Sequence, residues 1–218
     1  MLEIQKINVS IGSVNILRNI DIKVDDETFI GVIGRNGAGK TTLMKTIIGL
    51  LTHQGGSVKF GDHFFDKDTK PHVRARSGIG YMPEDRRLVP NLTVEENILL
   101  PAWSTKITHA DRRLQKIFRM IPEIEELKAR KAMFLSGGQQ KLVSLGRALM
   151  CGSKLLLLDE PFEGVAPGLA KRLVELIINL KNTGISVILT ESDLTHSRNL
   201  LDSVYMIDRG EIIKPQKI

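Results

Sequence analysis

The sequence predicts an α/β fold: a core with a mainly parallel sheet, an N-terminal antiparallel β subdomain and an inserted helical subdomain. Apolar residues alternate in period two near the N-terminus, strand-length apolar runs alternate with helical patterns elsewhere, and only helical spacing occurs from about residue 83 to residue 150. The 218 residues, 42% of them hydrophobic, provide material for one sizeable core. We therefore expect a single domain over residues 1–218, with an α/β core in 1–82 and 154–218 and the helical subdomain in 83–153.

The N-terminal third predicts an antiparallel ribbon followed by a strand and a helix. Alternate positions are apolar on either side of the turn-forming segment 12–15, namely Ile7, Val9 and Ile11 before it, and Ile20, Ile22 and Val24 after it. Residues 28–33 form a continuous apolar run, as expected for a strand that is buried on both faces. A helix is predicted from Lys40, because one face carries Leu43, Met44, Ile47, Ile48 and Leu51.

Strand patterns return after the helical region, in residues 154–158, 186–189 and 204–207. A helix between the first two has an apolar face made by Leu169, Leu173, Leu176, Ile177 and Leu180, and Gly184 is a natural cap for its C-terminus. Strands that alternate with helices at this spacing favour a mainly parallel sheet with crossover helices.

Composition argues against membrane-spanning, secreted and nucleic-acid-binding classes. No apolar stretch approaches the roughly 18–20 residues of a spanning helix, and residues 1–10 lack the features of a secretory signal, so we expect a soluble, cytosolic protein. The lone Cys151 fits a reducing compartment and is expected to be a buried apolar residue. The net charge of +6 is scattered, and we interpret the densest basic segments, 74–78 and 84–87, as solvated loops or contacts for an anionic ligand, with no nucleic-acid partner.

The segment GRNGAGKT matches the phosphate-binding pattern GxxxxGK[ST] and lies between a predicted strand and a predicted helix. Its glycines allow successive backbone amides to point inward, and the following helix adds its positive dipole end. We expect ATP and Mg²⁺ as cofactors, with Lys40 bridging the β- and γ-phosphates and the Thr41 hydroxyl coordinating Mg²⁺. The predicted nucleotide-binding residues here are Gly34, Arg35, Asn36, Gly37, Ala38, Gly39, Lys40, Thr41 and Thr42.

The segment KLLLLDEP carries two carboxylates at the C-terminal end of an apolar strand, where ligands bind in open α/β sheets. Asp159 is expected to hold the Mg²⁺ shell through water. Glu160 is expected to be the catalytic residue, as the general base that polarises and aligns the attacking water.

The segment LSGGQQ precedes a helical run and has capping-box spacing between Ser136 and Gln139. With free amides, a serine hydroxyl and two glycines, it predicts a second anion site, formed by Ser136, Gly137, Gly138 and Gln139. Because one nucleotide needs only one phosphate cradle, the economical interpretation is that this site clasps the nucleotide of a second copy, in a two-fold, head-to-tail sandwich.

The three motifs, in this order and with helices before the LSGGQQ signature, resemble an ABC-transporter ATP-binding subunit over essentially the whole chain. The resemblance implies a P-loop NTPase core and an ATPase that powers integral membrane permease subunits from the cytoplasmic face of the cell membrane. Residues 80–98 (GYMPEDRRLVPNLTVEENI) and 160–167 (EPFEGVAP) resemble the branch that imports branched-chain amino acids and urea. In this family, Glu84 stands where most relatives have a glutamine that touches Mg²⁺, and the loop around it faces the permease; a carboxylate can ligate Mg²⁺ too.

Two positions depart from the family pattern. Ile11 stands where relatives usually have an aromatic residue that stacks on adenine, and Ser192 replaces a histidine that contacts the γ-phosphate in many relatives. The nearby His196 is expected at the surface. These departures support an alternative, a hydrolysis-impaired ATP-binding subunit within a heterodimeric transporter. A third class, soluble ABC proteins that act on DNA or in translation, usually has two cassettes or a long coiled-coil insertion, and neither is present.

Overall fold

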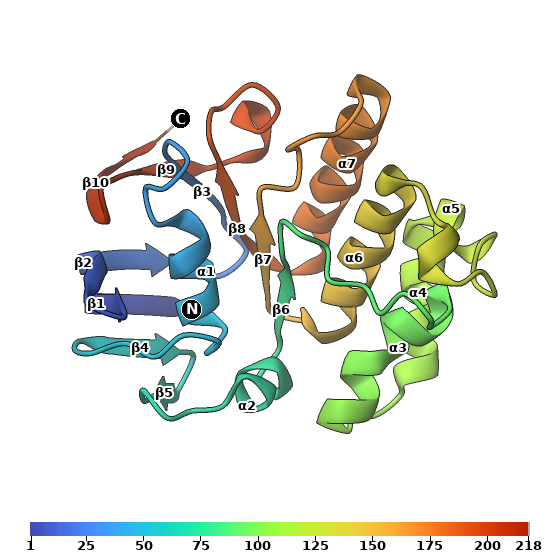
Figure 1. Cartoon of the computed structure of the whole chain (residues 1–218), viewed down its shortest axis with the longest axis horizontal. Coiled ribbons are helices and arrows are strands. Elements are labelled where there is room, and N and C mark those ends of the chain that lie inside the picture. Colours follow the sequence, from blue (N-terminus) through green and yellow to red (C-terminus); the bar gives the residue numbers. More distant parts are fainter. Residues whose placement is uncertain (218) are drawn as a thin grey trace.

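The computed structural model describes the backbone of residues 1–217 and the side chains of residues 1–213. It contains a four-stranded sheet in the order β2-β1-β4-β5 and a six-stranded sheet in the order β10-β9-β3-β8-β7-β6. Helix α1 lies between the two sheets, and the longer helices α3, α4, α6 and α7 lie on the other side of the six-stranded sheet (Figure 1). The expected α/β architecture is thereby confirmed.

The strands are β1 (Leu2–Ile11), β2 (Val14–Val24), β3 (Phe29–Ile33), β4 (Ser57–Phe60), β5 (His63–Phe65), β6 (Ile79–Met82), β7 (Leu155–Asp159), β8 (Ser186–Glu191), β9 (Ser203–Asp208) and β10 (Glu211–Lys217). The α-helices are α1 (Lys40–Ile47), α2 (Pro71–Arg76), α3 (Val94–Thr105), α4 (Ala110–Met120), α5 (Pro122–Glu125), α6 (Gly137–Cys151) and α7 (Pro167–Leu180). Short 3₁₀ turns are η1 (Ala132–Phe134), η2 (Lys181–Thr183) and η3 (Arg198–Leu200).

Most predicted elements are present. The β1–β2 ribbon is antiparallel, strands β3, β6, β7, β8 and β9 are parallel, and α7 is followed by Gly184 in the left-handed conformation with φ of 76°. Helix α1 is shorter than predicted, since it ends at Ile47 and the chain turns at Gly49, whose φ is 84°. Strands β4, β5, β6 and β10 were not predicted. The first three have only three or four residues, which is too short for an alternating pattern to be recognised, and β10 lies at the edge of its sheet.

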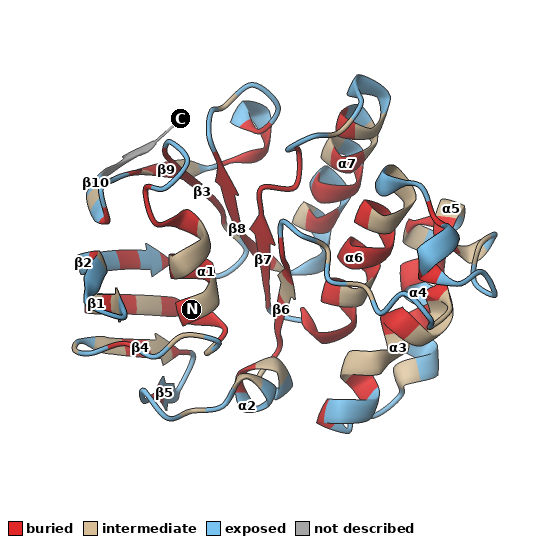
Figure 2. Ribbon diagram, in the orientation of Figure 1, coloured by how far each residue is buried: buried red, intermediate tan, exposed pale blue. Residues whose placement is uncertain are grey.

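The central strands are apolar without interruption because both faces of the sheet are covered. Leu155 and Leu157 of β7 pack in the cluster that includes α1 and the four-stranded sheet, whereas Leu156 and Leu158 pack against the helices. Strands β7 and β8 are accordingly buried along their length (Figure 2). Alternate residues of a strand point to opposite faces, so a strand covered on both sides has no polar positions. All five residues of β3 and of β7 are buried.

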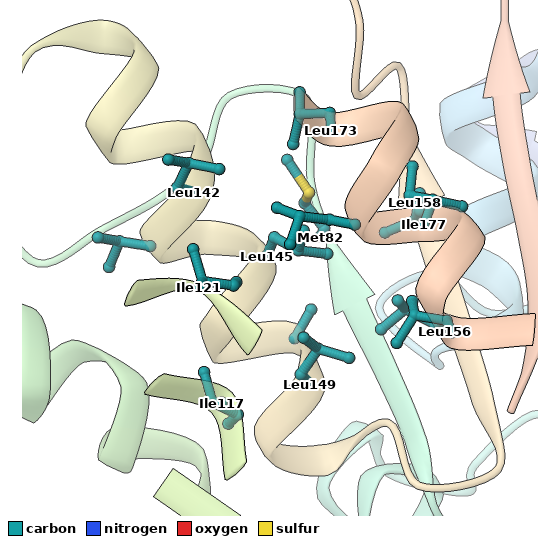
Figure 3. Packing of buried hydrophobic residues seen from close by; sticks show 14 of the residues in the cluster. Met82, Ile117, Ile121, Leu142, Leu145, Leu149, Leu156, Leu158, Leu173 and Ile177 are labelled. Carbon is teal, nitrogen blue, oxygen red and sulfur yellow. The ribbon is translucent and has the colours of Figure 1, made fainter. Parts of the chain in front are cut away.

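Helix α6 is the central element of the helical layer. Its residues Leu142, Leu145 and Leu149 belong to one buried cluster with Met82 of β6 and Leu173 of α7 (Figure 3). The sheet therefore fixes the position of α6 directly. The C-terminal ends of β3, β6, β7 and β8 lie at one edge of the sheet, where the chain continues into the predicted site segments.

The basic segment 74–78 is not a solvated loop, and that interpretation was wrong for Arg74. This side chain, in α2, is 1% exposed, and its guanidinium donates to the carbonyls of Thr46 and Ile47 at the end of α1 and to those of Thr69 and Asp66. The C-terminal carbonyls of a helix have no partners within it and carry partial negative charge, so a buried arginine satisfies and neutralises them. Sequence alone does not distinguish such an arginine from a solvated one.

Within residues 1–217, no helix is long and apolar enough to cross a membrane. Cys151 is buried, as expected, and forms no disulfide.

Candidate functional site

The GRNGAGKT segment forms the loop that joins β3 to α1. The amide of Gly34 donates to the Glu191 carbonyl at 3.1 Å, and a Cβ at Gly34 would lie 2.2 Å from the Ile207 carbonyl oxygen, so only glycine fits there. Gly39, with φ of 111°, precedes the first residue of α1 and gives it no side-chain cap. The first amides of α1 are therefore available to an anion at the loop.

Lys40 lies over this loop and is 3% exposed. Its Nζ donates to the carbonyls of Gly34, at 2.6 Å, and Arg35, at 3.1 Å, and it lies 3.1 Å from a carboxylate oxygen of Glu160. The predicted phosphate-binding cation and the predicted general base thus form a buried ion pair. An anion that binds in the loop competes with Glu160 for the ammonium group.

Asp159 is fully buried at the end of β7 and accepts three hydroxyl hydrogen bonds. The donors are Thr41, at 3.2 Å, Thr190 of β8, at 2.8 Å, and Tyr81 of β6, at 3.1 Å. Burial raises the pKa of Asp159, and the three hydroxyl bonds oppose this by stabilising the carboxylate. Thr41 and Asp159 bring hard oxygen donors together beside the loop, a donor set that suits Mg²⁺.

Glu160 adopts the left-handed conformation, with φ of 47°, which is unusual for a residue with a side chain. Its amide is directed toward the carbonyl and hydroxyl oxygens of Thr190, both at 3.1 Å, and its side chain is buried. Because such a conformation costs about 1–3 kcal/mol, its presence beside the phosphate loop is typical of a functional position.

Glu84, Glu160 and Glu163 place carboxylate oxygens within 4.8 Å of one another. The hydrogen bond with Glu160, together with some burial, raises the pKa of Glu163 to about 7. A cavity of about 430 Å³ lies between these carboxylates and the loop, and its lining comprises Ile16, Asn36, Gly37, Gly39, Lys40, Thr41, Thr42, Glu84, Glu160 and Glu163. Of the three predicted metal ligands, Thr41 and Asp159 are in contact, and Glu84 faces the same cavity from the loop after β6.

The signature segment begins α6 with the predicted capping box. The Gln139 amide donates to Ser136 Oγ at 3.3 Å, and the Ser136 amide donates to Gln139 Oε1 at 2.9 Å. Ser136 and Gly137 are exposed, and neither lines the cavity at Lys40. The second predicted anion site therefore faces outward, at a place separate from the first.

The departures from the family pattern have definite structural surroundings. Ile11 is 51% exposed at the tip of the ribbon, while Ile16 lines the cavity. Ser192 donates to Asn36 Oδ1 of the phosphate loop at 2.9 Å, so this position contacts the loop without a histidine. His196 is exposed, as expected, and packs against the ring of Phe162 with 5.6 Å between ring centroids.

Sequence reasoning missed several side chains that hold this site together, chiefly Thr190, Tyr81 and Lys141. The first two bind Asp159, and Lys141 of α6 donates to the carbonyls of Glu160 and Glu163. A charged residue on the buried face of an amphipathic helix was the one available signal for Lys141. No sequence pattern distinguishes the hydroxyls, because strands β6, β7 and β8 bring them together only in the folded sheet.

The chain is similar in sequence and in structure to known ATP-binding cassettes. The family profile described as ABC transporter matches residues 17–163. The high-affinity branched-chain amino acid transport ATP-binding protein BraG of Pseudomonas aeruginosa is 32% identical over 98% of this chain and 91% of its own length. The lipopolysaccharide export system ATP-binding protein LptB of Haemophilus influenzae is 30% identical over 98% of this chain and 89% of its own.

Among solved structures, the ADP conformation of MJ1267, an ATP-binding cassette of an ABC transporter, superposes with a TM-score of 0.86 at 31% identity. The match covers 100% of this chain and 91% of the MJ1267 chain. With the phosphate loop, the paired carboxylates and the capped signature helix all in place, the chain belongs to the ABC transporter family and is one of its ATP-binding, ATP-hydrolysing cassettes.

Proposed function

We propose that two copies of the chain, or this chain and a similar one, enclose two molecules of ATP between them. Each nucleotide is held by residues 34–42 of one subunit and by residues 136–139 of the other. The observation that carries this proposal is the outward-facing Ser136 helix start, which is separate from the cavity at Lys40. Met133 and Phe134, 53% and 61% exposed, add an apolar surface directly before Ser136 that suits a subunit contact.

Within each site, the chain's own residues have distinct roles. Lys40 exchanges its bond with Glu160 for the phosphates, which frees the Glu160 carboxylate to orient and deprotonate the attacking water. Thr41 and Asp159 would hold Mg²⁺, and Glu84, which faces the same cavity from the loop after β6, would be a further ligand. When bound, Mg²⁺ neutralises charge on the phosphates.

The permease contact is proposed at a groove of about 310 Å³ between α2, α3 and α6. Its lining includes His72, Tyr81, Pro101 and Arg147. Arg147 donates to the carbonyls of the basic loop after Glu84, and the Tyr81 hydroxyl donates to Asp159, so the groove is joined to the nucleotide site by hydrogen bonds. A permease segment seated there holds the cassette at the cytoplasmic face of the membrane.

For the cargo, we propose branched-chain amino acids or similar small solutes. The support is the identity with BraG and the resemblance of residues 80–98 and 160–167 to that branch. LptB has almost the same identity, so transport assays with vesicles decide between an amino acid and a lipopolysaccharide. Uptake of labelled leucine that depends on this chain and its permease supports the proposal, and stimulation of ATPase activity only by a lipopolysaccharide exporter's permease contradicts it.

The test of the nucleotide sandwich uses Glu160→Gln, which keeps the side-chain volume and removes the base. With Mg²⁺ and ATP the variant should accumulate as a dimer with two bound nucleotides, measured by analytical ultracentrifugation, while the wild type hydrolyses ATP. Glu126→Gln, at an exposed glutamate of the helical layer, is the matched control. A wild type without turnover, alone and with its permease, together with a monomeric Glu160→Gln variant, would contradict the proposal.

The alternative function, an impaired subunit within a heterodimer, is favoured by Ser192 and Ile11. Ser192→His should raise turnover substantially if the missing histidine limits hydrolysis. A negligible effect, or equal turnover by homodimers and mixed dimers, would remove this alternative.

A further inference from the structure

Lys141 is a fully buried cation in the middle of the signature helix. Its side chain is 1% exposed, in a helix whose residues Leu142, Leu145 and Leu149 belong to an apolar cluster (Figure 3). Burial lowers the pKa of Lys141, and the neighbouring Arg86 acts in the same direction. A buried charge is costly unless its donors are used, so the contacts of this ammonium group indicate why a lysine stands here.

Both protein contacts of the ammonium group are backbone carbonyls of the loop that begins with the general base. Lys141 Nζ donates to the Glu160 carbonyl at 3.0 Å and to the Glu163 carbonyl at 2.9 Å. The Glu163 amide also donates to the Glu160 carbonyl at 3.2 Å, which closes the turn. From the opposite side, Thr190 accepts from the Glu160 amide. Lys141 thus holds the peptide group that follows the Glu160 Cα, while Thr190 of β8 holds the peptide group that precedes it.

Ser136, the N-cap of the same helix, lies five residues before Lys141. The two positions are about one and a half turns apart and are joined by the hydrogen bonds of the helix backbone, so a displacement of the helix end is expected to displace Lys141 as well. Beyond Lys141, the Glu160 carboxylate pairs with Lys40 at 3.1 Å. A continuous path therefore joins the outward-facing signature serine of one subunit to the phosphate-binding lysine of the same subunit.

We propose that Lys141 is a positioning residue that holds Glu160 in its left-handed conformation and couples the two ATP sites of the dimer. When Ser136 of one subunit binds the nucleotide held by its partner, α6 is fixed in position. Lys141 then transmits that position to Glu160 of its own subunit. This inference rests on the proposed nucleotide sandwich. It assigns to Lys141 a role beyond packing, because an apolar side chain would fill the space without reaching the carbonyls.

The test compares Lys141→Met with Lys141→Gln and with the control Leu142→Ala. Methionine keeps the length but donates nothing, glutamine keeps one uncharged donor, and the control removes buried volume from the same helix. We expect Lys141→Met to lower kcat at least tenfold, to change KM for ATP less than twofold, and to lower the Hill coefficient for ATP toward 1. Lys141→Gln should recover part of kcat and of the Hill coefficient. Leu142→Ala should lower the stability to urea and leave the Hill coefficient as in the wild type.

Mixed dimers of differently tagged subunits show which site Lys141 serves. In a dimer of Lys141→Met with Lys40→Ala, the one intact phosphate loop belongs to the subunit with the altered Lys141, and its turnover should be slow. In a dimer of wild type with a subunit that carries both changes, the intact loop has its own Lys141, and turnover should equal that of a wild-type and Lys40→Ala dimer. The reverse order of rates would overturn the assignment.

The remaining outcomes separate this inference from the function on which it rests. A wild type without turnover, together with a Glu160→Gln variant that forms no ATP-dependent dimer, would refute both. A cooperative wild type whose kcat and Hill coefficient are unchanged in Lys141→Met would refute only the role of Lys141. A lower kcat with an unchanged Hill coefficient would overturn the coupling between sites.

Discussion

Glu191→Gln should remove a pH dependence from the stability of the nucleotide-free protein. Glu191, at the end of β8, is 9% exposed and accepts from the Phe162 amide at 3.1 Å. Burial is the largest influence and raises the pKa of Glu191 to about 7, from an ordinary value of 4.5. The unfolded chain therefore releases this proton at lower pH than the folded chain, so the free energy of unfolding falls as pH rises from 4.5 to 7.

The size of the effect follows from the shift, because each pKa unit corresponds to about 1.4 kcal/mol, which gives a fall of about 3 kcal/mol for this carboxyl. Glutamine has a similar shape, keeps an acceptor for the Phe162 amide and does not titrate. The assay is urea unfolding of both proteins between pH 4.5 and pH 8. Between pH 4.5 and pH 8, the free energy of unfolding of Glu191→Gln should rise by about 3 kcal/mol relative to that of the wild type. The control Glu126→Gln, at an exposed position, should show no such relative rise. A stability difference between variant and wild type that is independent of pH would refute the reasoning.

Three further changes test separate parts of the structure. Arg74→Met should lower the free energy of unfolding by about 1–3 kcal/mol in urea titrations, because four backbone carbonyls lose a buried cationic donor; an unchanged free energy of unfolding would contradict this. Phe134→Ala should weaken ATP-dependent dimerisation in ultracentrifugation at least tenfold, whereas Phe64→Ala, at a more exposed phenylalanine far from the signature in sequence, should leave it unchanged. Tyr81→Phe removes one of three hydroxyl donors to Asp159 and should raise the Mg²⁺ concentration for half-maximal turnover; an unchanged Mg²⁺ titration would show that the bond has no role.

The parts of the site that the sequence predicted are those made by neighbours in the chain. The phosphate loop needs only consecutive glycines between a strand and a helix, and the capping box joins Ser136 to Gln139, three residues apart. Asp159 and Glu160 follow directly from the strand that carries them. In each case the geometry is set within a few residues, so the order of residue types is sufficient to predict it.

The sequence did not predict which charged side chains are buried or which distant segments pair with one another. Arg74 was interpreted as a solvated residue because its partners are helix-end carbonyls from elsewhere in the chain. Short strands such as β5 and β6 exist because their neighbours pair with them, and their few residues carry too weak a pattern of their own.

The sequence by itself predicted the fold class, the phosphate loop at Lys40, the two carboxylates at the end of β7 and the capping box at Ser136. Only the tertiary structure decided that Thr190 and Tyr81 bind the Asp159 carboxylate, that Lys141 binds the backbone carbonyls of Glu160 and Glu163, and that Lys40 pairs with Glu160. The physical reason is that backbone turns and caps depend on local dihedral preferences, whereas a buried hydrogen bond depends on which strands lie side by side. Strand order in a parallel sheet is fixed by packing of the whole chain.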